Sequence, residues 1–143
     1  LGGCTDALIQ GGLMLAFGVF LGVSYTAQAV ALVIVFMLVL ASATVSIGLV
    51  IGSRMESPEG FNLIVSFLVF PLFFLSGALF PISNLPPWLR IFTSLNPVTY
   101  AVDGMRGVML GMSSFPVLLD FGVLAAFAAG MMVIGSIAFS RMK

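Results

Sequence analysis

The chain of 143 residues has no histidine and a single cysteine, Cys4. Without imidazole, histidine-based acid–base catalysis, histidine-ligated haem and most zinc sites are excluded. A lone cysteine forms no internal disulfide and no site that needs several thiolates. The absence of histidine and the single cysteine therefore rule out several common types of catalytic and metal site in this chain.

Charge is scarce as well. Charged residues make up 7% of the chain and hydrophobic residues 61%, and the mean hydropathy is +1.26. A soluble domain carries about 25% charged residues to keep its surface in water. The net charge is zero, so no basic field attracts nucleic acid. The composition therefore predicts an integral membrane protein whose main partner is the lipid bilayer.

Catalytic and nucleotide-binding patterns are missing too. No Gly-x-x-x-x-Gly-Lys-Ser/Thr segment cradles a phosphate, and no histidine or intramembrane lysine activates a serine. We therefore expect no catalytic site and no cofactor in this chain. No ionisable residue lies near the middle of an apolar stretch, although Asp120 lies about one turn into the last one. Because gradient-driven carriers usually need such a group, energy for uphill transport is expected from another subunit.

Four apolar stretches are long enough to cross a bilayer, which takes about 20 residues. In lipid every backbone polar group must be satisfied within its own segment, so each stretch is predicted to be a helix. The sequence thus predicts an all-α membrane protein with four transmembrane helices: 7–23, 28–52, 61–80 and 116–140.

The stretch 81–115 is predicted to form two helices too short to span. Prolines at 86–87 suit a first helical turn, and the Asn-Pro step at 96–97 separates the two helices. Such helices lie at the interface or dip into the membrane against the other spans. The first has an apolar face, opposite Arg90 and Thr93, made of Leu85, Trp88, Leu89 and Phe92.

Two features of the third span are candidate functional elements. Pro71 interrupts the helix beside Phe74 and Leu75, and it predicts either a fixed kink or a movable gate. Asn62 and Ser66 lie one turn apart and are a candidate pathway for a solute.

Small residues recur every three or four positions in two of the spans. This spacing lets membrane helices approach closely, so it predicts helix packing or, as the functional alternative, a sliding interface. The residues are Ala41, Thr44, Gly48 and Gly52 in the second span, and Gly122, Ala126 and Ala129 in the fourth.

Three motifs follow one another between residues 70 and 107: FPLFFLSGALFP, LPPWL and NPVTYAVDGMRG. Together they resemble the permeases of type 2 ABC (ABC-2) exporters, which commonly carry an LSG…FP segment, an LP-x-W helix and an NP-x-x-Y/H-x-x-D/E-x-x-R helix in this order. The hairpin positions that carry the resemblance are Pro81, Trp88, Asn96, Pro97, Tyr100, Asp103 and Arg106. The last two lie three apart on one helix face and are predicted to form a shielded ion pair.

The resemblance implies a six-span fold. Residues 1–143 would be a partial ABC-2 transmembrane domain holding spans three to six, with two spans and a coupling helix expected before Leu1. The stretch 81–115 would be an extracytoplasmic re-entrant helical hairpin before the last span. Both ends would then be cytoplasmic, and the count of basic residues agrees, with Arg54, Arg141 and Lys143 against Arg90 and Arg106.

The function implied by the resemblance is that of a permease subunit in a prokaryotic plasma membrane. It would be energised by a separate ATPase subunit that binds ATP and Mg, and it would pair with a second permease copy. The pattern is most similar to the drug-resistance branch, with daunorubicin-type exporters, and the substrate would be drug-like, lipid or polysaccharide. The alternatives are a secondary carrier or passive channel not coupled to ATP, and a membrane scaffold without transport. An ATP-binding neighbour protein would favour the first.

Overall fold

The computed structural model describes residues 2–140. The described residues form helices and no strand, which confirms the predicted all-α class. In chain order the elements are α1 (Gly2–Phe20), α2 (Ala27–Gly52), α3 (Pro58–Phe74), the short 3₁₀ helix η1 (Ile82–Asn84), α4 (Pro87–Leu95), α5 (Pro97–Leu110) and α6 (Val117–Ser140).

Three helices, α1, α2 and α6, are long and apolar enough to cross a membrane, and α3 is a shorter apolar helix of 17 residues. At a rise of about 1.5 Å per residue, α3 is roughly 25 Å long, less than the ~30 Å hydrocarbon core. The helix within the expected span 61–80 ends at Phe74. It ends there because Gly77 has φ +77°, a left-handed conformation that a helix cannot contain.

Polar side chains fix where two of the membrane helices begin. The Thr26 hydroxyl accepts a hydrogen bond from the Ala29 N–H at 3.2 Å and caps α2. The Ser57 hydroxyl accepts one from the Gly60 N–H at 3.2 Å, and Pro58 occupies the first turn of α3. Each cap satisfies a backbone donor that has no partner inside its helix.

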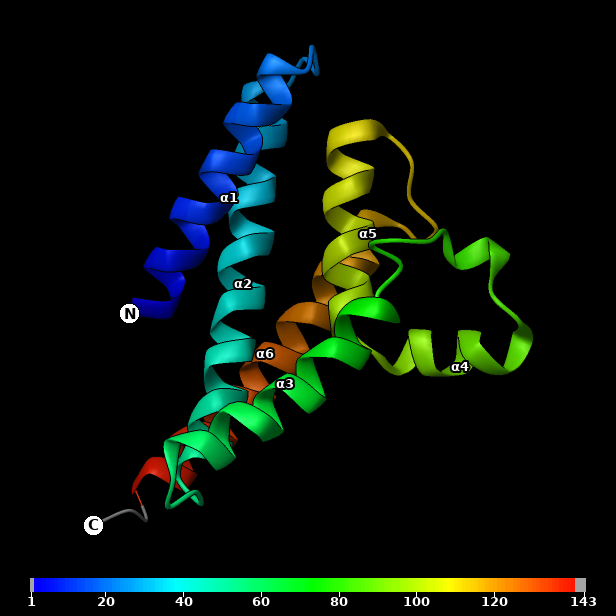
Figure 1. Cartoon of the computed structure of the whole chain (residues 1–143). Coiled ribbons are helices and arrows are strands. Elements are labelled where there is room, and N and C mark those ends of the chain that lie inside the picture. Colours follow the sequence, from blue (N-terminus) through cyan, green and yellow to red (C-terminus); the bar gives the residue numbers. More distant parts are fainter. Residues whose placement is uncertain (1, 141–143) are drawn as a thin grey trace.

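Helix α2 is the centre of the molecule. It contacts α1, α3, α5 and α6, and Figure 1 shows α1 on one side of it and α5 and α6 on the other. The α1–α2 connection lies at one end of the bundle, whereas the α2–α3 connection and the end of α6 lie at the opposite end (Figure 1). Helix α4 extends sideways, away from the bundle.

The core lies where α2, α5 and α6 meet. Phe36, Ala101 and Leu124 are each at most 1% exposed. The Phe36 ring packs edge-on against Phe121, with ring centroids 5.6 Å apart. A Cβ atom placed on Gly104 would lie 2.5 Å from the Phe36 ring, so only glycine allows α5 to approach α2 this closely.

The face of α6 that packs against the other helices is not the face of the small-residue stripe predicted from the sequence. Helix α6 turns Leu124, Ala128 and Gly135 inward, and a Cβ on Gly135 would lie 3.3 Å from the Ser46 carbonyl oxygen of α2. Leu124 fills the space beside Phe36, and that contact fixes the rotation of the helix. Of the stripe predicted in α2, Ala41 is buried and Thr44 is exposed. The exposed residues of the α6 stripe are Gly122, Ala126 and Ala129.

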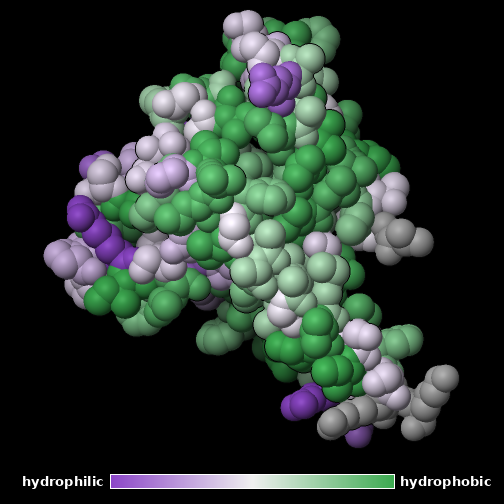
Figure 2. Space-filling model, turned by 180° about the vertical axis from the view of Figure 1, so that it is seen from behind, coloured by the Kyte–Doolittle hydropathy of each residue, from purple (hydrophilic) through white to green (hydrophobic). Residues whose placement is uncertain are grey.

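The surface of the bundle is mainly apolar. Figure 2 shows hydrophobic residues over most of the visible face, with hydrophilic ones gathered at the two ends and over the side that carries the hairpin. Helix α1 buries no residue in this chain, and its Met14, Phe17 and Phe20 side chains are 73%, 64% and 89% exposed. Apolar surface on this scale fits lipid or other protein rather than water.

Helix α4 is amphipathic, as predicted, and its apolar side faces outward. Trp88 and Phe92 are 63% and 56% exposed, whereas Thr93 is buried. The Thr93 hydroxyl donates to the Leu89 carbonyl within its own helix, at 3.1 Å, so its burial leaves no unsatisfied donor.

Candidate functional site: a polar clasp on α5

One face of α5 carries an unusual concentration of polar side chains for a membrane protein. Asn96, Thr99, Asp103 and Arg106 are spaced three, four and three residues apart, so they lie on one side of the helix. The first three are at most 4% exposed, and Arg106 is half-buried. We call these four residues the polar clasp, because they connect α5 to the end of α3 and to the start of α6.

The N-terminal part of the polar clasp satisfies carbonyl groups at the end of α3. Asn96 Nδ2 donates to the Leu72 carbonyl at 2.6 Å, while its Oδ1 accepts from the Val98 N–H at 3.0 Å and caps α5. The Thr99 hydroxyl lies 2.8 Å from the Thr93 carbonyl and 3.4 Å from the Leu75 carbonyl. Because the last carbonyls of a helix lack partners within it, the Asn96 side chain supplies a donor that the Leu72 carbonyl of α3 would otherwise miss.

Arg106 holds the turn that follows α3. Its Nη2 donates to the Gly77 carbonyl at 2.9 Å. Gly77 is buried, and its left-handed conformation favours glycine there. The residues from 72 to 77 are thus fixed at two points by α5.

Asp103 makes the connection to α6. Its carboxylate accepts from the Ser114 N–H at 3.0 and 2.8 Å and from the Phe115 N–H at 2.9 Å, just before α6 begins. The expected Asp103–Arg106 ion pair is wrong: among the described residues no ion pair joins them, and each binds backbone instead. Fixed N–H groups beside Asp103 satisfy its charge, and Arg106 reaches the turn after α3.

Sequence reasoning overlooked the burial of Asp120. This residue of the first turn of α6 is 0% exposed, and neither carboxylate oxygen has a hydrogen-bond partner within residues 2–140. A Cβ atom on Gly104 would lie 3.2 Å from the Asp120 Cβ, so the carboxylate lies against α5. A buried carboxylate without a partner is costly, and in membrane proteins it usually marks a functional position. Its place one turn into the span was visible in the sequence, whereas its burial depends on α5.

The other hairpin positions have separate roles. The Tyr100 hydroxyl donates to the Ser94 carbonyl at 2.7 Å, and its ring lies 5.7 Å from the Phe115 ring. Pro97 occupies the first turn of α5. Pro81 and Trp88 are exposed and lie outside the polar clasp.

The candidates on α3 are not gathered into the polar clasp. Asn62 and Ser66 are exposed. Pro71 lies in the last turn of α3, Phe74 is 53% exposed, and Leu75 is half-buried, with its carbonyl near Thr99. Their roles as pathway and gate stay predictions.

The polar clasp borders a cavity of about 410 Å³, whose wall includes Asp103 and Arg106 beside Leu79, Phe80 and Met112. On this wall, Asp103 and Arg106 each bind backbone groups of a neighbouring segment. The polar clasp joins the end of α3 to the segment before α6 through one short helix.

The fold and this site define a multi-pass helical membrane protein in which a polar hairpin joins two membrane helices. Comparison with known families adds the identity. The family model for the ABC-2 type transporter matches residues 5–110, which include all of α1 to α5 except the first three residues of α1. The chain belongs to the ABC-2 type transporter family.

Curated relatives agree with this assignment. The chain is 30% identical over 135 residues to the inner membrane transport permease YadH of Escherichia coli strain K12, which covers 86% of the chain and 53% of YadH. It is 32% identical over 86 residues to nodulation protein J of Rhizobium meliloti, covering 60% of the chain and 33% of that protein. The chain therefore spans about half the length of YadH and a third of nodulation protein J. No solved structure matches it.

Proposed function

We propose that the chain is part of the permease subunit of an ATP-driven exporter. A separate ATPase subunit would bind ATP and Mg and supply the work, and a second permease copy would complete the transporter. The substrate would be a drug-like, lipid or polysaccharide molecule, in line with the drug-resistance branch that the motifs resemble. The membrane would be the prokaryotic plasma membrane. Membership of the ABC-2 type transporter family supports this proposal.

The structural observation that carries the proposal is the polar clasp. Work done by a partner subunit reaches the transport pathway only if the membrane helices move in a coupled way between two states. Hydrogen bonds from α5 fix both the end of α3 and the segment before α6. A movement of α3 would therefore carry α5 with it and act on the start of α6.

A transport assay tests the energy source. The full-length permease, reconstituted with its ATPase subunit in vesicles, should move substrate in one direction when ATP is supplied. Transport should stop when the phosphate-binding lysine of the ATPase subunit is replaced. The permease alone should neither hydrolyse ATP nor accumulate substrate. Concentrative transport by the permease alone would contradict the proposal.

Topology can be tested separately. The proposal puts Ser57 on the cytoplasmic side, with Asn84 and Ser113 outside. The C-terminal Lys143, also expected on the cytoplasmic side, lies outside the described residues. Single cysteines at these positions, in a Cys4→Ala background, can be labelled in intact cells with an impermeant reagent. Labelling at position 57 without labelling at position 84 would contradict the orientation.

A secondary carrier is the second candidate, and one observation favours it. Asp120 is a fully buried carboxylate in a membrane helix with no partner among residues 2–140. Gradient-driven carriers use such groups. If the chain belonged to a carrier, Asp120→Asn would abolish transport driven by a proton or sodium gradient. Under our proposal ATP-driven transport by the full complex should survive this isosteric change.

A further inference from the structure

The hairpin encloses a second cavity, separate from the one beside Arg106. Its volume is about 400 Å³, and its wall comes entirely from residues 82–115: η1, α4, the first turn of α5 and the segment before α6. Figure 1 shows these elements arranged as an open frame beside the bundle. The described wall residues of this cavity thus all come from one continuous segment of the chain.

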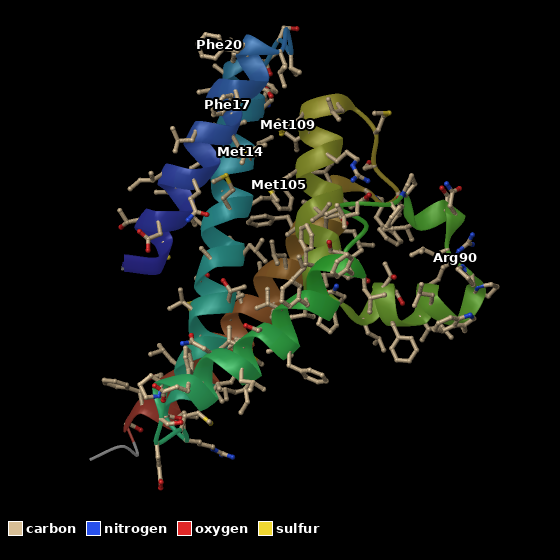
Figure 3. All side chains as sticks on the ribbon, in the orientation of Figure 1. Met14, Phe17, Phe20, Arg90, Met105 and Met109 are labelled. Atoms are coloured by element: carbon tan, nitrogen blue, oxygen red, sulfur yellow. The ribbon has the colours of Figure 1, made fainter. Side chains whose placement is uncertain are left out.

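The frame is held open by its own hydrogen bonds. Arg90 Nε donates to the Leu85 carbonyl at 3.0 Å and its Nη2 to the Ser83 carbonyl at 2.6 Å, which ties α4 to the segment 83–85 at the end of η1. Figure 3 shows Arg90 on α4 next to that segment. On the opposite side, Asp103 fixes the backbone of Ser114 and Phe115. The cavity is therefore largely pre-formed, as ligand sites usually are.

The wall of this cavity carries a positive charge, from Arg90. Among the residues that the structure describes, Arg90 is the only ionisable one on the wall of this cavity. An arginine carries five N–H donors, and two of those of Arg90 are used within the described chain. The remaining donors suit a carboxylate or phosphate, which guanidinium groups bind through paired hydrogen bonds.

Of the five wall residues that carry a hydroxyl group, three add acceptors rather than donors. Thr93, Ser94 and Thr99 all donate their protons to backbone carbonyls, at 3.1, 2.9 and 2.8 Å. Their oxygens can therefore only accept from a ligand. The rest of the wall includes the apolar side chains of Ile82, Ile91 and Phe115.

We propose that this cavity binds an anionic amphiphile. Arg90 holds the carboxylate or phosphate, and Ile82, Ile91 and Phe115 contact the apolar body. The ligand is either the headgroup end of an anionic membrane lipid or a free amphiphile of the same chemistry. The site does not depend on ATP-driven transport, so it stands or falls separately from the proposed function.

Photolabelling tests the proposal on the full-length permease in phosphatidylcholine nanodiscs. A diazirine-bearing fatty acid and the matching fatty alcohol differ only in the charged group. The acid should label residues 82–94 and 113–115, located by mass spectrometry, and the alcohol should label them far less. Replacing part of the phosphatidylcholine with phosphatidylglycerol distinguishes the sources. Competition with the acid assigns the site to a lipid headgroup, and no competition assigns it to a free amphiphile.

Variants sharpen the test. Arg90→Gln should lower labelling by the acid roughly tenfold, the effect of losing a charge-assisted hydrogen bond. The matched control is Arg54→Gln, which removes an exposed arginine from the α2–α3 loop and should change nothing. Ile91→Trp fills the cavity without altering charge and should also prevent labelling, which covers the case in which Arg90→Gln fails to fold. Equal labelling by acid and alcohol, or full labelling of Ile91→Trp, would overturn the proposal.

Discussion

The hairpin and the helix α1 use the same membrane environment in opposite ways. Helix α1 buries no residue within this chain, and its exposed side chains are apolar. The hairpin buries Asn96, Thr99 and Asp103 and satisfies each of them through named backbone partners. In lipid, an apolar helix requires no specific partner, whereas a buried polar group requires one. The polar contacts of this kind therefore lie in the hairpin, whereas α2 and α6 are fixed by packing around Phe36 and Leu124.

The largest expected effect comes from Asp103→Ala. The change leaves the Ser114 and Phe115 N–H groups without their acceptor and should lower the free energy of unfolding by about 3 kcal/mol. Heating the full-length permease in detergent and measuring the fraction that stays monodisperse by size exclusion checks this. Asp6→Ala, which removes an exposed carboxylate from α1, is the control and should have little effect. Equal stability of the two variants would contradict the conclusion that buried polar groups of the hairpin stabilise the protein more than exposed groups of α1.

Asn96→Ala should have the next largest effect, about 2 kcal/mol, because it removes both the cap of α5 and the bond to the Leu72 carbonyl. Its matched control is Asn62→Ala on α3, where the side chain is exposed. The same heating assay compares the two. A greater loss in the Asn62 variant would mean that α3 has a buried polar contact in the full-length protein.

Gly104→Ala tests the packing of the hairpin against α2. The new methyl group would meet the Phe36 ring at 2.5 Å, so a loss of roughly 1–3 kcal/mol is expected. Gly122→Ala in α6, where no other described group outside the helix's own backbone lies within 4 Å of the added atom, should be neutral or slightly stabilising. Phe36→Leu combined with Gly104→Ala should recover part of the loss. If it recovers none, the ring is not the source of the clash.

The smallest effect is expected for the interaction free energy between Asp103 and Arg106. Because each binds its own backbone partner, the effects of Asp103→Ala and Arg106→Ala should add within about 0.5 kcal/mol. All four proteins of the double-mutant cycle can be compared in one thermal assay. A double variant more stable than Asp103→Ala alone would show that Asp103 and Arg106 interact, as the sequence spacing predicted.

Parts of the candidate site could be read from the sequence. The i, i+3, i+4 spacing put Asp103 and Arg106 on one face, and the Asn-Pro step marked the start of α5. The partners could not be read, because Leu72, Gly77 and Ser114 offer backbone groups, which no residue type reveals. The rotation of α6 was unpredictable for a similar reason. Several of its faces carry small residues, and the contact with Phe36 selects one.

The amino-acid sequence alone was enough to predict a helical protein with membrane-crossing segments, because apolar stretches of about 20 residues satisfy their backbone groups in lipid as helices. It also determined the family, since the three motifs and their order survive without any knowledge of contacts. The partners of the polar residues in the hairpin followed from the three-dimensional contacts and not from the sequence. Hydrogen bonds between segments 11 to 29 residues apart depend on how α5 lies between α3 and α6, and that placement follows from packing around Phe36, Gly104 and Leu124.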